Sequence, residues 1–548
     1  MKNRLKINIL IALTSLLSVS CSDMLDKVPD NRAELKSPTQ IAEVLTGAYP
    51  NANYSLLTEF SGDNFVDNTS PDKNGIYYPL LSAREKMHDE IYAWEDVKSS
   101  EQQDSPSYVW EACYHGIAVA NHALKAIEKL ENEGRADEVK AVKGEALICR
   151  AYQHFLLANI FCQSYKNVSQ SEQDLGIPYV TEPEKTVFVQ YERGTVASVY
   201  QKIKEDLERG ISLIDDGIYQ VPKYHFNKRA AHAFAARFYL FIRDYDKVIE
   251  HATIALGSDP AGFMRSWAED TPTFDSFKNH WVNSESLNNF LLLATSSTFN
   301  RVFGNRYGFN REASEGSVYG RGPTWTTSFH PCYEGRLYLR GKQEYGLFFP
   351  KVGEFFEYTD KVAGIGFPHI VRCEFTGEET LLCRAEAYVY KNQFDNALND
   401  LRVWDDSRKT TPTRTINSPE YKTLSHQLIK SFYTPQAKLF VFPLNTTLMS
   451  SDFVITPEQE PYVHCVLHFR RIETIFDGLR WFDIKRYGIE IEHKIGRERV
   501  EKLVWNDSRR AIQLPQEVIA SGMAPNDRFV APSKDQNIQL SEKCVVID

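Results

Sequence analysis

The sequence lacks the short motifs that mark common metal and catalytic sites. Its nine cysteines form no C-x-x-C pair, so neither a zinc ribbon nor a thioredoxin-like site is indicated. His-Glu-x-x-His, Gly-x-Ser-x-Gly and Ser-x-x-Lys do not occur in a supporting arrangement. The string Gly320-Arg321-Gly322 has neither the preceding strand nor the Lys-Ser/Thr helix start of a phosphate-binding loop. We therefore expect no catalytic residues, no bound metal and no cofactor.

An excess of basic charge is also missing. The chain has 63 Lys plus Arg against 73 Asp plus Glu, a formal net charge of -10 and a pI near 5.9. Because phosphate contacts need clustered basic residues, this balance opposes binding to nucleic acid and favours neutral ligands. With 548 residues, 42% hydrophobic and 25% charged, the composition is that of an ordinary globular protein with a large core.

The one notable hydrophobic run, at the N-terminus, is too short to span a bilayer. Three basic residues open the chain, and the apolar stretch Ile7–Val19 follows them, as in a secretory signal. Small residues then precede Cys21. This order predicts a bacterial lipoprotein signal at residues 1–20 and a mature chain held to a membrane by a lipidated Cys21. The alternative is an ordinary cleaved signal with an incidental cysteine.

The other eight cysteines permit disulfides without requiring any. Cys113, Cys149 and Cys162 lie in apolar segments with helical spacing, which favours buried thiols. Cys373 and Cys383 form the pair that we would first test for a disulfide.

Amphipathic segments with helical periodicity occur in pairs along much of the chain. Small alanines beside bulky aromatics and short polar turns are typical of tetratricopeptide-like helix pairs, although generic all-α packing is the alternative. The predicted helices cover residues 38–49, 108–131, 136–162, 196–213, 228–241, 245–256, 378–390 and 394–404.

Loop-rich stretches interrupt these pairs at 51–107 and at about 258–376. Aromatic residues make up 12% of the chain, enough to supply flat rings that stack on the C–H faces of sugars. Core packing is the alternative for each ring. The candidate ligand-binding residues in these stretches are Trp94, Trp267, Trp281, Trp325 and Tyr319.

A charged and apolar stretch near the C-terminus, residues 470–488, is predicted to be one helix that closes the fold. Its apolar residues recur at spacings of three and four, and Asp477 and Arg480 lie one turn apart. Charges beside an apolar face are tolerated when they are paired, so we expect ion pairs that fix how neighbouring segments dock. His464 and His468, four residues apart just before this stretch, lack a third ligand and are interpreted as structural.

Five motifs resemble those of one family, the SusD-like (RagB/SusD) outer-membrane lipoproteins of Bacteroidetes. RRIETIFDGLRWFDIKR is similar to the family's ERR-x-E-F-x-x-E-G-x-R-W-x-D-L-x-R segment, and CSDMLDKVP to its C-x-D-x-L-D-x-x-P start. LLCRAEAYVYKNQFDNALNDLRVW and AHAFAARFYLFIRDYDKVIEHA resemble its helix-pair segments, and RAIQLPQEVI resembles its closing element.

The resemblance implies a mainly α fold: a tetratricopeptide-like helix-pair scaffold carrying a loop-rich mixed subdomain. In this sequence we expect one SusD-like domain over residues 21–548. Its parts would be a scaffold at about 37–257 and 377–405, an insertion at about 258–376 and a closing region at 406–548.

The resemblance also implies a function. We expect a lipid-anchored outer-membrane protein, exposed at the cell surface, that captures a polysaccharide or oligosaccharide. It would deliver this ligand to a TonB-dependent (SusC-like) transporter without catalysing a reaction. Two alternatives stay open: a secreted glycoside hydrolase, and a helix-repeat scaffold that binds a peptide or protein.

Overall fold

The computed structural model describes most of the chain between residues 35 and 528. The described ranges are 35–77, 81–184, 189–265, 273–318, 320–325, 338–339, 346–409 and 422–528. None of the helices in these ranges is long and apolar enough to cross a membrane.

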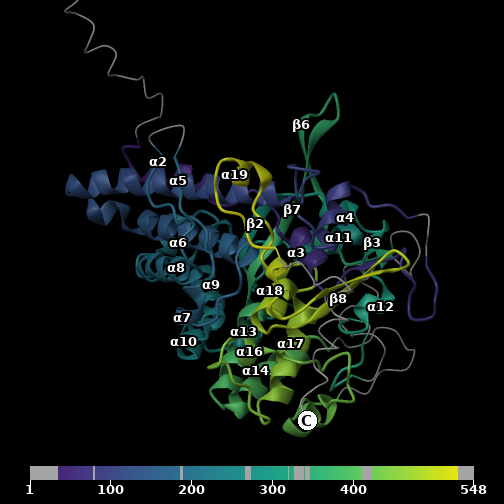
Figure 1. Cartoon of the computed structure of the whole chain (residues 1–548). Coiled ribbons are helices and arrows are strands. Elements are labelled where there is room, and N and C mark those ends of the chain that lie inside the picture. The colour runs from purple at the N-terminus through teal and green to yellow at the C-terminus, as the bar shows by residue number, and fades with distance from the viewer. Residues whose placement is uncertain are drawn as a thin grey trace, which may run out of the picture.

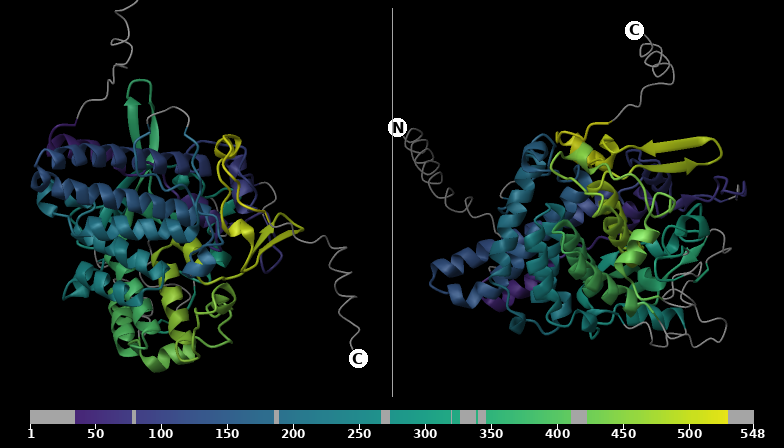
Figure 2. Two further views of the ribbon diagram at one scale, coloured as in Figure 1. Left: turned by 60° about the vertical axis from the view of Figure 1, so that its left-hand side comes forward. Right: turned by 90° about the horizontal axis from the view of Figure 1, so that it is seen from below.

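A stack of antiparallel helices forms the larger part of the molecule (Figures 1 and 2). Each helix packs against the next: α5 on α6, α6 on α8, α9 on α10, α10 on α13, α13 on α14 and α17. Their bounds are α5 Pro106–Asn132, α6 Ala136–Phe161, α8 Val196–Ile211, α9 Lys228–Phe241, α10 Tyr245–Leu256, α13 Gly377–Tyr390, α14 Phe394–Ser407 and α17 Glu460–Glu473.

Shorter helices surround this stack. The α-helices are α2 Pro38–Leu45, α3 Ser55–Ser61, α4 Lys86–Tyr92, α7 Val168–Ser171, α11 Phe274–Trp281, α12 Arg311–Ser314, α15 His426–Phe432, α16 Thr446–Met449, α18 Leu479–Arg486 and α19 Gln516–Ala520. The 3₁₀ turns are η1 Thr46–Ala48, η2 Asp216–Ile218, η3 Pro222–Tyr224, η4 Pro260–Phe263, η5 Phe299–Arg301, η7 Pro350–Val352 and η8 Ser508–Arg510.

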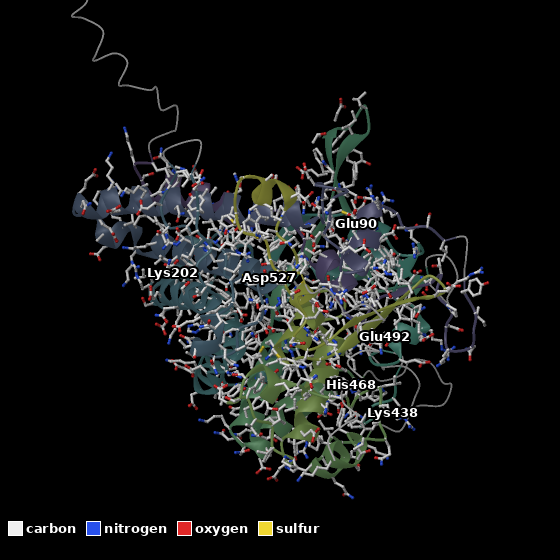
Figure 3. The ribbon with its side chains drawn as sticks, in the orientation of Figure 1. Glu90, Lys202, Lys438, His468, Glu492 and Asp527 are labelled. Atoms are coloured by element: carbon white, nitrogen blue, oxygen red, sulfur yellow. The ribbon has the colours of Figure 1, made fainter. Side chains whose placement is uncertain are left out.

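The strands form small antiparallel sheets beside the helices. The largest sheet has the order β2-β7-β6, and its strands are β2 Asn289–Ser296, β7 Ile365–Thr376 and β6 Phe355–Asp360. The two-stranded pairs are β1 Val66–Asp67 with β3 Tyr307–Gly308, β4 Tyr338–Leu339 with β5 Leu347–Phe348, and β8 Ile491–Ile495 with β9 Arg499–Leu503. The β6–β7 hairpin stands clear of the body, and its side chains point into solvent (Figures 1 and 3).

The predicted mainly α fold with helix pairs and a loop-rich mixed part is confirmed. Local signals explain the helix boundaries. Ser105 accepts a hydrogen bond from the Tyr108 N–H and Pro106 follows it, which is a favoured start for a helix such as α5. Gly134 has φ +84° between α5 and α6, a conformation that glycine adopts without strain.

The predicted single closing helix is wrong, because two helices occupy that stretch. Helix α17 ends at Glu473 and α18 begins at Leu479. Between them Phe476 has φ 66° and Gly478 has φ 82°, so the chain turns out of the helical path. The Gly478 N–H donates to Glu59 Oε1 at 2.9 Å, and this contact holds the turn against α3.

Asp477 and Arg480, which lie one turn apart in the predicted helix, do not pair with each other. Asp477 accepts a hydrogen bond from Lys351 Nζ at 2.7 Å, and Arg480 forms an ion pair with Asp63 at 2.8 Å. Burial would raise the pKa of Asp63, but Arg471 and Arg480 together lower it below its usual value. The break between α17 and α18 therefore directs these side chains to different segments.

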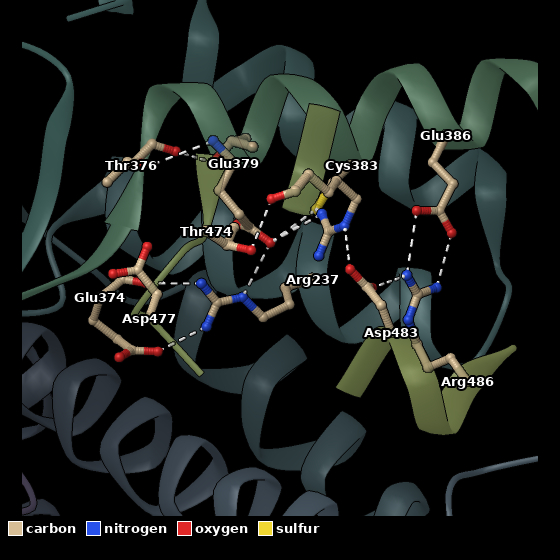
Figure 4. A network of polar contacts seen from close by, with 12 residues as sticks. Arg237, Glu374, Thr376, Glu379, Cys383, Glu386, Thr474, Asp477, Asp483 and Arg486 are labelled. Carbon is tan, nitrogen blue, oxygen red and sulfur yellow. Dashed lines mark hydrogen bonds and ion pairs between the residues drawn. The ribbon is translucent and has the colours of Figure 1, made fainter. Parts of the chain in front are cut away.

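Buried ion pairs join the closing helices to the scaffold and the sheet, as the sequence predicted (Figure 4). The residues are Arg237 on α9, Glu374 on β7, Glu379 and Glu386 on α13, Arg470 on α17, and Asp483 and Arg486 on α18. Each is at most 7% exposed. We call this group the arginine–carboxylate network.

Each arginine of the network contacts two carboxylates. Arg237 lies 2.7 Å from Glu374 and 3.3 Å from Glu379. Arg470 lies 3.4 Å from Glu379 and 3.1 Å from Asp483. Burial would raise the pKa of Asp483, but Arg470 and Arg486 outweigh that effect and hold the pKa of Asp483 below its usual value. The carboxylate is therefore charged in the folded protein.

The candidate disulfide between Cys373 and Cys383 is not present. Both residues are free thiols, as are the other described cysteines. Cys383 Sγ donates to Glu379 Oε1 at 3.2 Å, while Cys373 Sγ donates to the Trp281 carbonyl at 3.4 Å, so the two thiols contact different partners. Cys113, Cys149 and Cys162 are buried, as predicted.

Replacement of Gly478 by alanine tests the turn between α17 and α18. A Cβ there would lie 2.2 Å from Thr58 Oγ1 and would also require a strained positive φ. Gly134, with φ +84° and open space around its Cβ position, is the matched control. We expect a loss of about 1 kcal/mol for Gly134→Ala and of about 3 kcal/mol or more for Gly478→Ala, measured by urea unfolding. Equal losses would show that close packing at the turn is unimportant.

Replacement of Lys485 by methionine tests the cost of a buried amine on α18. Its Nζ donates to the carbonyls of Asn159 and Cys162 at 2.5 and 2.7 Å, and burial lowers the pKa of Lys485 to about 7. Between about pH 7 and pH 10 the Lys485 position therefore binds more protons in the unfolded chain than in the folded protein. The contribution of Lys485 to the unfolding free energy consequently rises with pH.

From pH 7 to pH 9 we expect wild type to gain on the order of 2 kcal/mol of unfolding free energy relative to Lys485→Met. Urea unfolding at both pH values measures the difference. Lys361→Met on the exposed hairpin is the control and should follow wild type. A constant gap between Lys485→Met and wild type would contradict the account.

Candidate functional site

The tryptophans predicted to bind ligand pack in the interior where the structure describes them. Trp94, Trp281 and Trp325 are 7%, 5% and 1% exposed. Trp94 stacks on His493 with ring centroids 4.0 Å apart, and the Arg265 guanidinium lies 3.7 Å from the Trp281 ring. The structure does not bring the three rings together in one pocket, so their contact with a ligand stays a prediction.

The glycine-rich string near Trp325 serves to seat that ring. The Trp325 indole N–H donates to the Gly320 carbonyl at 2.9 Å. A Cβ at Gly322 would lie 2.2 Å from the ring, so only glycine fits there. Trp267 and Tyr319, the other two candidates, and the predicted lipidation site Cys21 lie outside the described residues.

A groove of about 760 Å³ runs between the first turns of α5 and the edge strand β2. We call it the β2–α5 groove. Its lining comes from four segments: Thr46, Gly47, Tyr49 and Asn51 after α2; Tyr108, Glu111, Ala112 and His115 on α5; Tyr224 and His225 at the end of η3; and Leu292–Ala294 on β2.

A buried carboxylate fixes the floor of the β2–α5 groove. Glu145 on α6 is fully buried, and its Oε1 accepts a hydrogen bond from the Tyr49 hydroxyl at 2.6 Å. His225 Nδ1 lies 2.8 Å from the same oxygen. The Tyr49 hydroxyl in turn accepts the Phe226 N–H at 2.8 Å. Because these side chains hold one another, Tyr49 and His225 present a defined surface to the groove.

Burial and the neighbouring Cys149 and Glu145 raise the pKa of Tyr49 well above its usual value. The hydroxyl therefore stays neutral and continues to donate to the carboxylate at any physiological pH. The Tyr219 ring stacks on His225 with centroids 4.5 Å apart, which further fixes the imidazole.

The outer edge of β2 supplies backbone groups to the groove. In an antiparallel pair, alternate residues direct their N–H and C=O toward the partner strand. The Ser297 N–H donates to the Pro368 carbonyl of β7 at 3.2 Å. Leu293 lies four residues earlier, so by this alternation its backbone N–H and C=O also point toward β7. The backbone groups of Leu292 and Ala294 consequently point away from β7, to the side where both residues line the groove.

Asparagine side chains close this edge at both ends. Asn51 Oδ1 accepts the Ser296 N–H at 3.0 Å, and Asn227 Nδ2 donates to the Phe290 carbonyl at 2.8 Å. Proteins commonly block strand edges to prevent unwanted pairing. Here the blocked positions flank a short open window, which we define as the backbone N–H and C=O groups of Leu292 and Ala294.

The rim of the groove combines aromatic rings with polar groups. Tyr224 is 50% exposed and Tyr108 is partly exposed, and Glu111 and His115 lie one turn apart on the solvent side of α5. Flat rings beside hydrogen-bonding groups suit a polyhydroxylated ligand, since the rings contact its C–H faces and the polar groups its hydroxyls. Within the described residues no three His, Cys, Asp or Glu side chains gather as a metal site.

Sequence reasoning missed most of these groove residues because they lie in the segments interpreted as scaffold. One signal was available. The connection from α8 to α9, residues 212–227, is longer than most helix–helix connections and carries Tyr219, Tyr224 and His225. A long aromatic connection within a helix-pair scaffold indicates a functional loop.

A larger hollow of about 1050 Å³ lies along another face of α5. It contains Trp110 and Tyr191 together with the acidic side chains of Glu182, Glu184 and Glu192. Residues 185–188, next to it in sequence, are outside the described ranges. The three glutamates make the lining of this hollow acidic, so it suits a neutral polyhydroxylated ligand less well than the β2–α5 groove, whose lining has one carboxylate.

Comparison with known proteins agrees with the fold. Residues 23–240 match the family model SusD-like_3, described as starch-binding associating with outer membrane. No curated protein sequence matches the chain.

Solved SusD-like structures resemble this one over nearly their whole length. A SusD superfamily protein from Bacteroides thetaiotaomicron has a TM-score of 0.58 and 18% identity, covering 90% of this chain and 100% of its own. A SusD-like carbohydrate binding protein from Bacteroides vulgatus has a TM-score of 0.55 and 15% identity, with 89% and 97% covered. A laminarin binding SusD-like protein has a TM-score of 0.52 and 15% identity, with 90% and 100% covered. Identities this low establish the fold, not the ligand.

Proposed function

We propose that this chain, a SusD-like protein by its fold and by the family match of its residues 23–240, binds a neutral glycan in the β2–α5 groove. It acts by binding alone, at the outer surface of the cell. The observation that carries the proposal is an open groove where exposed tyrosine rings lie beside free backbone and side-chain hydrogen-bonding groups.

The chemistry of the groove supports a sugar better than a charged ligand. Its lining includes one carboxylate, Glu111, and two histidines, and the remaining lining residues are uncharged: three tyrosines, Thr46, Asn51 and small or aliphatic residues. A pyranose ring stacked on Tyr224 would leave its hydroxyls near Glu111 and the open window of β2. Related proteins described as binding starch, laminarin or carbohydrate make glucose polymers the first ligands to test.

We further propose that the mature chain begins at a lipidated Cys21 in the outer membrane and passes its glycan to a TonB-dependent, SusC-like transporter. The lipoprotein-type N-terminus and the family description of outer-membrane association support this arrangement. The groove would hold the ligand until the transporter accepts it.

An extended peptide is a second candidate ligand for the same groove. The open window on β2 offers N–H and C=O groups with the spacing of a strand, and peptides bind sheet edges by adding a strand. Only two residues of the edge are open, between the Asn227 and Asn51 contacts. This short window favours a glycan over a long peptide strand.

Replacement of Tyr224 by alanine tests the stacking surface. We expect roughly tenfold weaker binding of maltooligosaccharides or laminarin oligosaccharides, because a stacked ring contributes about 0.5–1.5 kcal/mol beyond its burial. Isothermal titration calorimetry measures the affinity. Tyr358→Ala is the matched control, since Tyr358 is 52% exposed but lies on the β6–β7 hairpin. Binding of a glycan that is insensitive to Tyr224→Ala would place the ligand elsewhere.

Replacement of Ala294 by proline tests the open window of β2. Proline removes the outward N–H but leaves the bonds between β2 and β7 intact, and edge strands tolerate proline in this orientation. We expect at least fivefold weaker glycan binding, since a neutral hydrogen bond contributes about 1 kcal/mol. Ala294→Val keeps the N–H and should bind within about twofold of wild type. If a tripeptide binds more weakly to Ala294→Pro but normally to Ala294→Val, and no glycan binds, the peptide is the ligand.

A further inference from the structure

The β6–β7 hairpin exposes a set of apolar side chains. It projects from one side of the molecule (Figures 1 and 2). The exposed residues and their exposed fractions are Phe356 36%, Tyr358 52%, Val362 100%, Ile365 60% and Phe367 60%. A group of exposed apolar side chains this dense indicates a surface that becomes covered in the working protein.

The apolar residues lie on both faces of the hairpin and at its tip. Phe356 and Tyr358 share one face, and their ring centroids are 4.8 Å apart. Phe367 pairs with Glu357 and so lies on the opposite face, together with Ile365 two residues before it. A flat partner surface would cover only one of these faces. An environment that surrounds the tip covers both.

The root of the hairpin is held firmly to the body. Glu354 forms a two-point ion pair with Arg301 at 2.6 and 2.7 Å. Lys278 Nζ donates to the Glu354 carbonyl at 3.1 Å and lies 4.4 Å from the Phe355 ring. At Gly366 a Cβ would lie 1.9 Å from the Glu357 carbonyl, so the two strands approach closely. The hairpin is therefore a fixed projection whose tip points in a defined direction.

We propose that the tip of this hairpin inserts into the headgroup region of a lipid membrane and so orients the protein on its tether. This inference rests in part on the proposed lipid anchor at Cys21. Leu35 lies fourteen residues after Cys21. A fully extended chain of that length reaches at most about 50 Å. Helix α2, which begins at Pro38, lies on the same side of the molecule as the hairpin (Figures 1 and 2), so the tether draws this side toward the membrane.

The hairpin chemistry limits the insertion to a shallow depth. Within the described residues the outer edge of β6 pairs with no other strand, and the hydrocarbon core does not tolerate unpaired backbone groups. Glu357, Asp360 and Lys361 add charge to the hairpin. Aromatic side chains with adjacent polar groups are enriched at the membrane interface. The hairpin thus matches the headgroup layer, where water still reaches its backbone and charges.

An orienting contact would matter for the β2–α5 groove. A flexible tether alone lets the body rotate freely, whereas a second contact fixes which side faces the membrane. Strand β7 belongs to the hairpin and also pairs with β2, whose edge lines the groove. Insertion of the tip therefore sets the direction in which the groove opens.

Vesicle binding of the full mature chain carrying Cys21→Ser tests the proposal without any acyl chain. We expect the protein to sediment with phosphatidylcholine vesicles, with and without added lipopolysaccharide, and at least tenfold weaker association for the double variant Val362→Asp/Phe367→Asp. Val168→Asp is the matched control, since Val168 on α7 is 60% exposed and lies away from the hairpin (Figure 1). It should bind vesicles like the parent.

Circular dichroism and thermal unfolding establish that the variants are folded, and glycan titration of the same proteins separates this proposal from the proposed function. Loss of vesicle binding with intact glycan binding supports it. Failure of the parent to bind either vesicle type, or equal binding by the double variant, overturns it. Concentration-dependent self-association that only the double variant abolishes would assign the hairpin to a second copy of the chain instead.

Discussion

The arginine–carboxylate network is the constraint on which the rest of the structure depends. A buried arginine or carboxylate is tolerated only beside a partner of opposite charge, so each pair fixes the relative position of the two elements that carry it. Arg237 fastens α9 to β7 through Glu374, and Arg470 fastens α17 to α13 through Glu379. Removal of one partner would leave a buried charge unpaired, which costs about 3–5 kcal/mol.

The same network extends to the β2–α5 groove through the segment after η1. Glu374 forms an ion pair with Arg372 at 2.8 Å, and Arg372 donates to Asn53 Oδ1 at 2.7 Å. Asn53 in turn donates to Ser297 Oγ at 3.0 Å. Asn53 lies two residues after Asn51, which caps the edge of β2. The buried charges therefore position the chain that shapes one wall of the groove.

Strand β7 connects the exposed and buried parts of the molecule. Its first residues belong to the projecting hairpin, its middle pairs with β2 beside the groove, and Glu374 near its end belongs to the network. Because one strand passes through all three regions, the tip, the groove and the core hold fixed relative positions. A contact made at the tip is in this way related geometrically to the β2–α5 groove.

The helix pairs could be predicted from sequence because their apolar spacing is a local property that burial reinforces. The turn at Phe476 could not be predicted from sequence, because Phe476 fits the helical spacing of the apolar residues. In the structure its ring packs against Phe303 and Phe309, with ring centroids 5.0 and 5.3 Å apart, and this packing explains why the residue leaves the helix.

Apart from the long connection between α8 and α9, the candidate site was also hidden from sequence, for a related reason. Tryptophan marks either a core or a ligand surface, and composition does not say which. In the described part of the chain the candidate tryptophans pack inside, while Tyr224 is exposed because η3 turns it outward. The open window of β2 depends on strand register and order, which are non-local and leave no motif.

The lining of the groove also bears on whether binding or hydrolysis is its function. Glycoside hydrolysis requires two carboxyl groups on opposite sides of the scissile bond, about 5–9.5 Å apart. Glu111 is the one carboxylate among the groove-lining residues. Glu145 lies beneath the lining, and its Oε1 is already engaged by the Tyr49 hydroxyl and near His225. A second carboxyl group positioned for acid or base work is thus missing from the groove lining, whereas rings and hydrogen-bonding groups for holding a sugar are present. The described lining therefore supports the proposed binding role.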